Sequence, residues 1–133
     1  MLEKLNHIGI VVRDLDQAME LYRDIYGLEP IMMYESPTAK AKIAFFPIGD
    51  VTIEIIQPLS SESAAGRFLD KRGEGVHHIA FVVKEIDKRL EELEEKGVQL
   101  IDKKSRMVRD SELVGFLNPK STHGVLTELI QED

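Results

Sequence analysis

Two histidines open two similar stretches of the chain. The stretch HIGIVVRDLD begins at His7 and returns as HIAFVVKEID from His78, 71 positions later. Five of the ten positions are identical, and the other five are conservative exchanges. Neutral imidazole is a common metal ligand, and histidine also exchanges protons near neutral pH. The repeated histidines are therefore candidates for metal binding or proton transfer.

Two glutamates recur in the same way near the end of each half. The stretch VTIEIIQ contains Glu54, and VLTELIQ contains Glu128, 74 positions later. An ionised carboxylate in an apolar strand is costly unless it is paired or bound to a cation. Neighbouring positions have drifted, as Thr52 against Leu126 shows, whereas the acidic ones have not. We interpret the repeat as a functional site, although duplication alone also explains a resemblance between the halves.

The four side chains make a donor set that suits a divalent metal ion. Two imidazoles and two carboxylates supply two nitrogen and two oxygen ligands, which leaves two octahedral positions for water or substrate. Because the chain has no cysteine, nitrogen and oxygen must hold any metal. Cobalt, manganese, magnesium, nickel and zinc ions all satisfy this set, and the sequence does not choose among them. The predicted metal ligands are His7, Glu54, His78 and Glu128.

The two remaining histidines have other expected roles. Side chains alternate along a strand, so His77 lies on the strand face opposite His78. We expect His77 to be structural, solvent-facing or a partner of a metal ligand. His123 lies in the sequence Ser-Thr-His-Gly and is expected in an exposed turn.

A helix is expected after the first repeated stretch. Asp14 stands at the N-cap position, where its carboxylate accepts a hydrogen bond from the first turn. Gly27 ends the run, as glycine commonly does after a helix. Apolar residues between them recur at helical spacing and predict a buried face made of Leu15, Ala18, Leu21, Tyr22 and Ile25.

The rest of the chain fits two copies of one βαβββ module. In the second half, DKRLEELEEKG predicts a helix that Gly97 ends. An insert, SSESAAGRFLDKRGEG, predicts another helix that begins at Ser61 or Ser63 and ends at Gly73 or Gly75. Apolar and β-branched runs predict the strands. These cover residues 5–12, 28–34, 40–48 and 51–56 in the first half, and 76–83, 98–102, 112–117 and 124–130 in the second.

This organisation predicts one domain of the α+β class. A length of 133 residues suits one hydrophobic core and is short for two conventional domains. We expect module one over about residues 1–58, a linker helix over about 59–75 and module two over about 76–133. The two tandem βαβββ modules are expected to form a curved, partly open mixed sheet around the metal site.

Charge and hydropathy exclude several classes of function. The formal net charge is −7, so a basic face for nucleic-acid binding is not expected. No apolar run approaches the ~20 residues of a membrane span, and the N-terminal MLEKLNH lacks the apolar segment of a signal peptide. We therefore expect a cytoplasmic protein that binds neither nucleic acid nor membrane.

Taken together, these residues resemble the vicinal oxygen chelate (glyoxalase) superfamily, and within it the methylmalonyl-CoA epimerase family. The resemblance rests on LNHIGIVV, IEIIQPL, an insert ending FLDKRGEGVHHIAF, and FLNPKSTHGVLTELIQ. It implies the glyoxalase fold, a homodimer and a divalent metal held by the four ligands named above. The implied activity is that of an isomerase, which interconverts (R)- and (S)-methylmalonyl-CoA by 1,1-proton transfer through a metal-stabilised enolate.

The resemblance also implies an acid/base residue on each face of the reacting carbon. Glu128 is the first, because it resembles the proton-transferring position of the superfamily. Some family members place a second glutamate on the third strand, but here that strand reads AKAKIAFF and has no acid. Its expected inner face carries Ala41, Ile43 and Phe45. We therefore hypothesise that Glu54 is the second catalytic base.

Several features of the pocket stay open at this point. Asn118 stands where the family often has histidine, and His123 stands where it often has glycine. Two alternative functions are glyoxalase I (lactoylglutathione lyase) and a non-catalytic small-molecule-binding protein of the same fold. Ethylmalonyl-CoA is a further candidate substrate. Candidate cations for the CoA phosphates are Lys120, Arg106, Arg109, Arg67 and Lys71.

Overall fold

The structure, a computed structural model, describes residues 1–132 and separates into two compact units. We call residues 7–77 the N-terminal unit, and residues 1–6 with the residues from 78 onward the C-terminal unit. Each unit contains four neighbouring strands and at least one helix on a face of its sheet. Each is described separately below.

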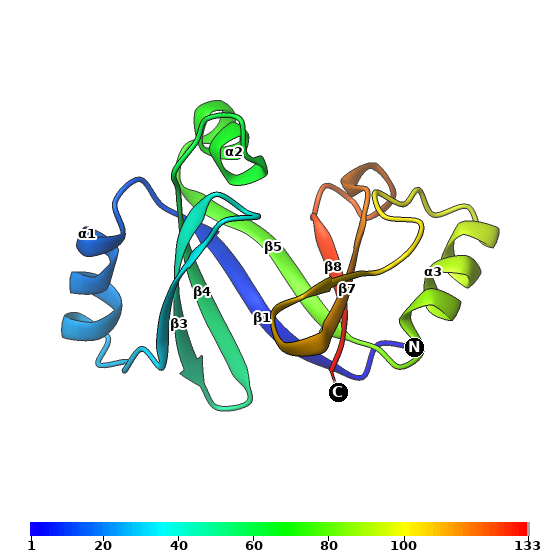
Figure 1. The fold of residues 1–133 in the computed structure, drawn as a ribbon, viewed down its shortest axis with the longest axis horizontal. Helices are drawn as coiled ribbons and strands as arrows, with labels where there is room; N and C mark the ends of the chain where they lie inside the picture. The colour runs from blue at the N-terminus through cyan, green and yellow to red at the C-terminus, as the bar shows by residue number, and fades with distance from the viewer. Residues whose placement is uncertain (133) are drawn as a thin grey trace. The chain divides into compact units, whose positions relative to one another are not determined.

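The N-terminal unit holds the first βαβββ module. Its elements are β1 (Lys4–Val11), of which residues 7–11 belong to this unit, α1 (Leu15–Met19), the π-helix η1 (Glu20–Ile25), β2 (Met32–Ser36), β3 (Ala41–Ile48), β4 (Val51–Pro58) and α2 (Ala64–Arg72). The strand order is β2-β3-β4-β1, with β1 parallel to β4 and the other neighbours antiparallel. Figure 1 shows α1 beside β3 and β4.

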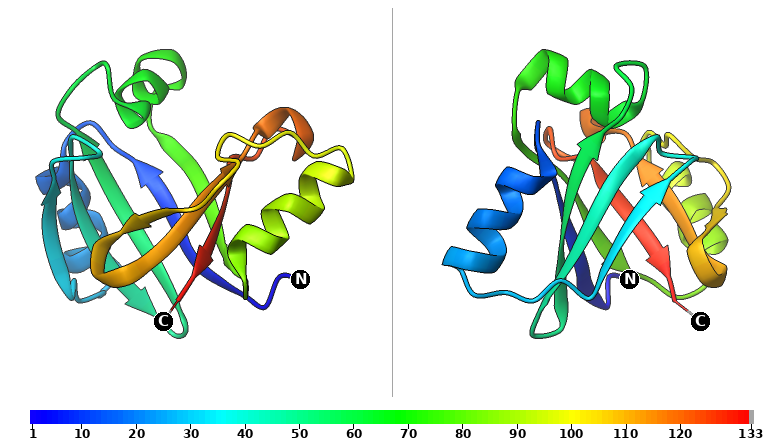
Figure 2. Two further views of the ribbon diagram at one scale, coloured as in Figure 1. Left: turned by 45° about the vertical axis from the view of Figure 1, so that its right-hand side comes forward. Right: turned by 60° about the vertical axis from the view of Figure 1, so that its left-hand side comes forward.

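The C-terminal unit repeats this plan. Its elements are β5 (Gly75–Val82), of which residues 78–82 belong to this unit, α3 (Ile86–Glu95), β6 (Arg106–Val108), the 3-10 helix η2 (Arg109–Ser111), β7 (Glu112–Leu117), the 3-10 helix η3 (Pro119–Ser121) and β8 (Thr127–Gln131). The strand order is β5-β8-β7-β6, with β5 parallel to β8 and the other neighbours antiparallel. Both views of Figure 2 show α3 alongside β7 and β8. The predicted α+β class with two βαβββ modules is confirmed.

In each unit, the main apolar core lies between the sheet and the first helix of the module. In the N-terminal unit, Leu15 and Met19 of α1 pack with buried residues of β3 and β4 such as Phe46. In the C-terminal unit, Ile86 and Leu90 of α3 pack in the same way on β7 and β8. Side chains alternate between the two faces of a strand, so every second strand residue lies on the sheet face opposite this core. The histidines and glutamates of the repeat lie on that opposite face.

The insert between the modules forms the expected helix, α2. Of the two predicted start points, Ser63 is the N-cap, and its hydroxyl oxygen accepts a hydrogen bond from the Gly66 N–H at 3.0 Å. Gly73 is the C-cap, with a φ of 76° that favours glycine. Among residues 1–132, no helix combines the length and the hydropathy that crossing a membrane requires.

The predicted face of the first helix is partly wrong. The α-helix ends at Met19, and the chain continues as a π-helix in which the Tyr26 N–H donates to the carbonyl of Leu21 at 2.8 Å. This wider turn changes the angular spacing of side chains. Leu21 and Ile25 therefore point to solvent, with Ile25 74% exposed, instead of joining Leu15 in the core.

Two predicted strands are misplaced. The strand predicted over 28–34 is β2 at Met32–Ser36, because the Leu28 N–H still closes the helix by donating to the Tyr22 carbonyl at 2.9 Å. The strand predicted over 98–102 is only an isolated bridge between Leu100 and Leu117. The strand beside β7 is instead β6, several residues later. The other predicted strands agree with the structure to within a few residues.

Candidate functional site

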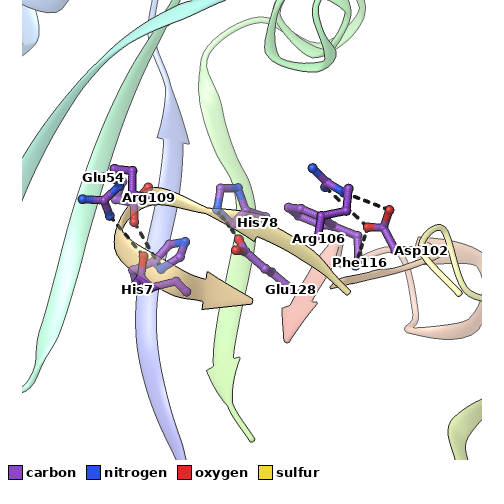
Figure 3. A network of polar contacts seen from close by, with 9 residues as sticks. His7, Glu54, His78, Asp102, Arg106, Arg109, Phe116 and Glu128 are labelled. Carbon is purple, nitrogen blue, oxygen red and sulfur yellow. Dashed lines mark hydrogen bonds and ion pairs between the residues drawn. The ribbon is translucent and has the colours of Figure 1, made fainter. Parts of the chain in front are cut away.

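The N-terminal unit brings together the first histidine and the first glutamate of the repeat. His7 Nδ1 lies 3.2 Å from Glu54 Oε2, and both side chains are largely buried. The parallel register of β1 and β4 causes this contact, because it sets Gly9 opposite Glu54 and leaves His7 two residues away on the same face. Figure 3 shows the pair, with His7 on β1 and Glu54 on β4.

The C-terminal unit brings together the second histidine and the second glutamate. His78 Nε2 lies 3.3 Å from Glu128 Oε1, and both residues are buried. The register is the counterpart of the first, because Ala80 on β5 stands opposite Glu128 on β8. Figure 3 shows this second pair as a separate contact. The structure thus contains two half-sites built in the same way, one in each unit.

A small residue stands opposite each carboxylate in the strand pairing. The residue two places after each histidine is Gly9 in the first half-site and Ala80 in the second, and each is set opposite a glutamate.

The chemistry of the two pairs fits a divalent cation. Each pair contributes one imidazole nitrogen and one carboxylate oxygen, and only Glu54, with its side chain 14% exposed, is less than fully buried. A buried carboxylate is stabilised by a positive charge, which a protonated imidazole or a metal ion can provide. A metal requires the imidazole in its neutral form, and the nitrogen and oxygen donors present suit first-row divalent ions.

His77 has a structural role, which was one of the roles expected for it. It lies on the face of β5 opposite His78. Its ring lies 5.1 Å from the Phe68 ring of α2, centroid to centroid, with an interplanar angle of 89°. Burial lowers the pKa of His77 to about 4, so its imidazole is neutral at physiological pH. His77 therefore anchors α2 against the start of β5.

Two glutamines support the half-sites, and no role was predicted for them. Gln57 Oε1 accepts a hydrogen bond from the Leu15 N–H at 2.8 Å, at the start of α1. Gln131 Oε1 accepts the equivalent bond from the Ile86 N–H at 2.8 Å, at the start of α3. Each glutamine is the third residue after a candidate glutamate. The recurrence of this glutamine in IEIIQ and TELIQ was the sequence feature from which its role could have been predicted.

The third strand of each module places an aromatic residue beside the carboxylate. Phe45 stands opposite Glu54 in the β3–β4 pairing, and Phe116 stands opposite Glu128 in the β7–β8 pairing. Ala41 and Ile43 share the face of Phe45 and pack in an apolar cluster with α2 residues. On this face β3 carries no carboxylate, in agreement with the sequence.

The candidate phosphate-binding cations lie in both units. In the C-terminal unit, Arg106 pairs with Asp102 at 3.1 Å, and Arg109 pairs with Glu112 at 3.6 Å. In the N-terminal unit, Arg67 on α2 donates to the carbonyl oxygen of Glu62. Lys71 and Lys120 are exposed, as are Arg67 and Arg106.

The two departures from the family pattern have local structural roles. Asn118 caps η3, because its side-chain oxygen accepts a hydrogen bond from the Lys120 N–H at 2.9 Å. His123 is exposed, as expected, and adopts a φ of 57° in the turn before β8. Neither residue contributes to the histidine–glutamate pairs described above.

A protein-family comparison identifies the class. Residues 6–116 match the model of the Glyoxalase/Bleomycin resistance protein/Dioxygenase superfamily. This match spans most of the chain and both repeated histidines. The chain belongs to this superfamily, and the predicted membership is confirmed.

Individual relatives narrow the class further. The chain is 36% identical to the uncharacterized protein YqjC of Bacillus subtilis, over 98% of this chain and 93% of that protein. It is 32% identical to the ethylmalonyl-CoA/methylmalonyl-CoA epimerase of Cereibacter sphaeroides, over 98% and 99%. A structure of Streptomyces coelicolor methylmalonyl-CoA epimerase in complex with 2-nitronate-propionyl-CoA superposes with a TM-score of 0.92 at 35% identity, covering 99% and 96%. The resemblance to methylmalonyl-CoA epimerases, which are isomerases, is confirmed.

Proposed function

We propose that the protein catalyses the metal-dependent epimerisation of methylmalonyl-CoA by 1,1-proton transfer. The observation that carries the proposal is the duplicated half-site, in which each unit presents one buried histidine–glutamate pair. An epimerase needs one proton-transferring group for each face of the reacting carbon. Two equivalent carboxylates, Glu54 and Glu128, meet that need.

We propose that one divalent ion is held by both pairs. The ligands are His7, Glu54, His78 and Glu128, which supply the nitrogen and oxygen donors that such an ion prefers. When bound, the ion supplies positive charge to the thioester and carboxylate oxygens of the substrate. Cobalt, manganese, magnesium, nickel and zinc are the candidates.

The two carboxylates divide the proton transfer between them. In one direction, Glu128 removes the proton from C2 of one enantiomer, and the electron pair of the C–H bond moves into the enolate. Protonated Glu54 then donates a proton to the opposite face of C2, which produces the other enantiomer. The roles exchange in the reverse direction. The absence of an acid on the Ala41, Ile43 and Phe45 face of β3 supports Glu54 for the second role.

The ligand of the Streptomyces relative supports an enolate. A nitronate is planar and carries its negative charge on oxygen, as an enolate does, and that ligand is attached to CoA. A protein that binds a nitronate in this way is complementary to the species formed when C2 loses its proton. The similarity in fold and sequence extends this support to the present chain.

The direct test is hydrogen exchange at C2 of methylmalonyl-CoA in D2O, followed by proton NMR. We expect the purified, metal-loaded protein to replace the C2 proton with deuterium. Exchange should stop when a chelator removes the metal and resume when the metal is returned. The same sample reports epimerisation if a single enantiomer is supplied.

The contrary result would be a fully metal-loaded protein that leaves the C2 proton in place. The glutathione hemithioacetal of methylglyoxal is then the next substrate, because glyoxalase I uses similar proton chemistry. If neither substrate reacts, a non-catalytic binding protein of the same fold is the remaining alternative. Binding of metal to the purified protein argues against that alternative.

We propose ethylmalonyl-CoA as a second substrate. The Cereibacter relative carries both acyl-CoA names, and its alignment covers almost all of each chain. One additional methylene changes binding in an apolar pocket by only ~1–3 kcal/mol. We expect kcat/KM for the two substrates to differ by about 10–200-fold at most. The ratio of the two kcat/KM values, measured with one enzyme preparation, shows whether ethylmalonyl-CoA is a second substrate.

We also propose a homodimer located in the cytoplasm. The π-helix η1, the segment that follows it and β2 expose several large apolar side chains that a second copy would cover. They are Leu21, Ile25, Tyr26, Ile31 and Met33. Analytical ultracentrifugation should give twice the monomer mass, and replacing Ile25 with glutamate should shift it toward the monomer.

A further inference from the structure

An aromatic side chain contacts the second half-site. Phe116 on β7 stands opposite Glu128 on β8 in the antiparallel register. Its ring lies 5.9 Å from the His78 ring, centroid to centroid, and the two planes meet at 76°. Nearly perpendicular packing at this distance is a favourable arrangement of aromatic rings. Phe116 therefore touches a candidate metal ligand and faces the same side of the sheet as its glutamate.

The backbone of Phe116 is held by the segment before β6. Its N–H donates to Asp102 Oδ2 at 2.9 Å, and its carbonyl accepts from the Ile101 N–H at 2.9 Å. The β6–β7 pairing ends where Arg106 stands opposite Val114 and does not reach Phe116, so the Asp102 carboxylate satisfies a backbone donor that a longer ladder would otherwise satisfy. This anchors the residue at a break in the sheet.

The same carboxylate holds an arginine over the ring. Arg106 Nε donates to Asp102 Oδ1 at 3.1 Å, and the guanidinium carbon lies 5.9 Å from the centroid of the Phe116 ring. Figure 3 shows Asp102 bonded to Arg106, with Phe116 beside them and the His78–Glu128 pair nearby. A cation at this distance from an aromatic ring is attracted by it. The ring is thus in contact with both Arg106 and His78.

The position of Phe116 does not match that of a core residue. The main apolar cluster of the C-terminal unit lies between α3 and the other face of β7, where Leu117 and Leu129 pack. Phe116 is only half-buried and belongs to neither apolar cluster described for this unit. Its contacts include Arg106, His78 and the polar groups that fix its backbone.

We propose that Phe116 is a positioning residue that orients the His78 imidazole for metal binding, and that Asp102 and Arg106 hold it in place. The inference rests on the proposed function, because it requires His78 to be a metal ligand. A histidine side chain rotates about two bonds, so its nitrogen lone pair points at a metal only if neighbours restrict the ring. Outer residues that orient a ligand typically change metal affinity by about 10–100-fold when they are replaced.

The test compares Co2+ binding to metal-free wild type, Phe116→Leu and Phe116→Tyr, using the visible absorption of the bound ion. We expect Phe116→Leu to bind Co2+ about 10-fold more weakly and to alter its spectrum. Phe116→Tyr keeps the ring and should bind as the wild type does. The matched control is Phe81→Leu, the same exchange on the opposite face of β5, where Phe81 packs in the α3 core. That variant should be less stable but should bind Co2+ normally.

A second readout needs no metal. In the metal-free protein, the ring current of Phe116 shifts the NMR signals of the His78 imidazole protons. Phe116→Leu should move these signals toward ordinary positions, and Phe81→Leu should leave them unchanged. If Phe116→Leu does not fold, Asp102→Asn and Arg106→Gln test the same contact from its outer side. Each should weaken Co2+ binding in the same direction.

The outcomes separate this inference from the function on which it rests. Wild-type protein that binds no divalent ion would overturn the metal site and this inference with it. Wild type that binds Co2+, with unchanged affinity and spectrum in Phe116→Leu, would overturn the positioning role alone. Equal losses of Co2+ affinity in Phe116→Leu and Phe81→Leu would also overturn it, because the effect would then follow from general destabilisation.

Discussion

Glu54 and Glu128 occupy equivalent positions, but the two half-sites are not identical. The first glutamate approaches its histidine at Nδ1 and the second at Nε2, and the small residue opposite is glycine in one case and alanine in the other. The side chain opposite each glutamate on the third strand is phenylalanine in both units. The two half-sites therefore share their strand register and differ in the imidazole nitrogen that faces the carboxylate.

Replacing each glutamate with glutamine should show which glutamate transfers the proton on which face of C2. We expect Glu54→Gln and Glu128→Gln each to slow epimerisation by about 100-fold or more, since an amide cannot transfer the proton. Each variant should still exchange C2–H of one enantiomer, and the two variants should prefer opposite enantiomers. Deuterium incorporation into each enantiomer measures this preference. Glu91→Gln on the exposed side of α3 is the control.

Two results would contradict that assignment. Glu54→Gln with normal turnover and normal metal content would remove Glu54 from the catalytic role. Loss of bound metal in either variant would instead show that the glutamate is needed as a ligand, so metal content must be measured in parallel.

Gly66 meets a steric limit at the start of α2. A Cβ added to Gly66 would lie 2.0 Å from the carbonyl oxygen of Ser60, closer than atoms can approach. We expect Gly66→Ala to lower the free energy of unfolding by about 1–3 kcal/mol, because the loop before α2 must move. Chemical denaturation measures the change. Gly75→Ala is the control, since a Cβ at Gly75 meets no atom within 4 Å, and equal losses in both variants would refute the steric explanation.

Among the elements, the first helix of each module is fastened to the last strand of that module by one glutamine. Gln57 on β4 accepts from the first residue of α1, and Gln131 on β8 accepts from the first residue of α3. The first N–H groups of a helix have no partner within the helix, so these side-chain oxygens satisfy them. The same strand carries the glutamate of the half-site, which links the helix position to the site.

The glutamine contacts predict local effects. We expect Gln57→Ala to lower the free energy of unfolding by about 1–3 kcal/mol and to speed hydrogen exchange at the start of α1, because a buried donor loses its acceptor. Gln131→Ala should act in the same way on α3. Hydrogen exchange resolved along the chain distinguishes the two variants. Gln17→Ala, on an exposed position of α1, should change little, and uniform acceleration across both helices would contradict a local role.

For the whole molecule, the proposed ion takes its ligands from both units and should therefore stabilise the complete fold. A ligand that binds only the folded state adds ~2.7 kcal/mol of stability at a concentration 100 times its Kd. We expect Mn2+ or Co2+ to raise the Tm of chelator-treated protein in a concentration-dependent way. Differential scanning calorimetry measures the shift.

Histidine variants provide the comparison for this prediction. His7→Ala and His78→Ala should each reduce the metal-dependent rise in Tm, although they lie in different units. His123→Ala, at the exposed turn before β8, should keep the full rise. A rise that survives the loss of either ligand histidine would place the ion elsewhere.

The module plan and the candidate ligands could be predicted from the order of residues along the chain. The two halves have the same apolar pattern around one His and one Glu. This repeat can be recognised because strand alternation and helix periodicity are local properties of the chain. The same pattern excluded an acid from the inner face of β3, and the structure agrees. Strand ends and the face of the first helix were less accurate, because the π-helix that exposes Ile25 has no clear signal in local periodicity.

Which side chains contact one another depends on the three-dimensional fold. The His7–Glu54 and His78–Glu128 contacts depend on the parallel registers of β1 with β4 and β5 with β8, which join segments far apart in the chain. The glutamine caps likewise span 42 and 45 positions. The packing of Phe116 between Arg106 and His78 depends on a break in the β6–β7 ladder. Such contacts arise from register and packing, which follow from burial of the whole chain and not from the pattern of any single segment.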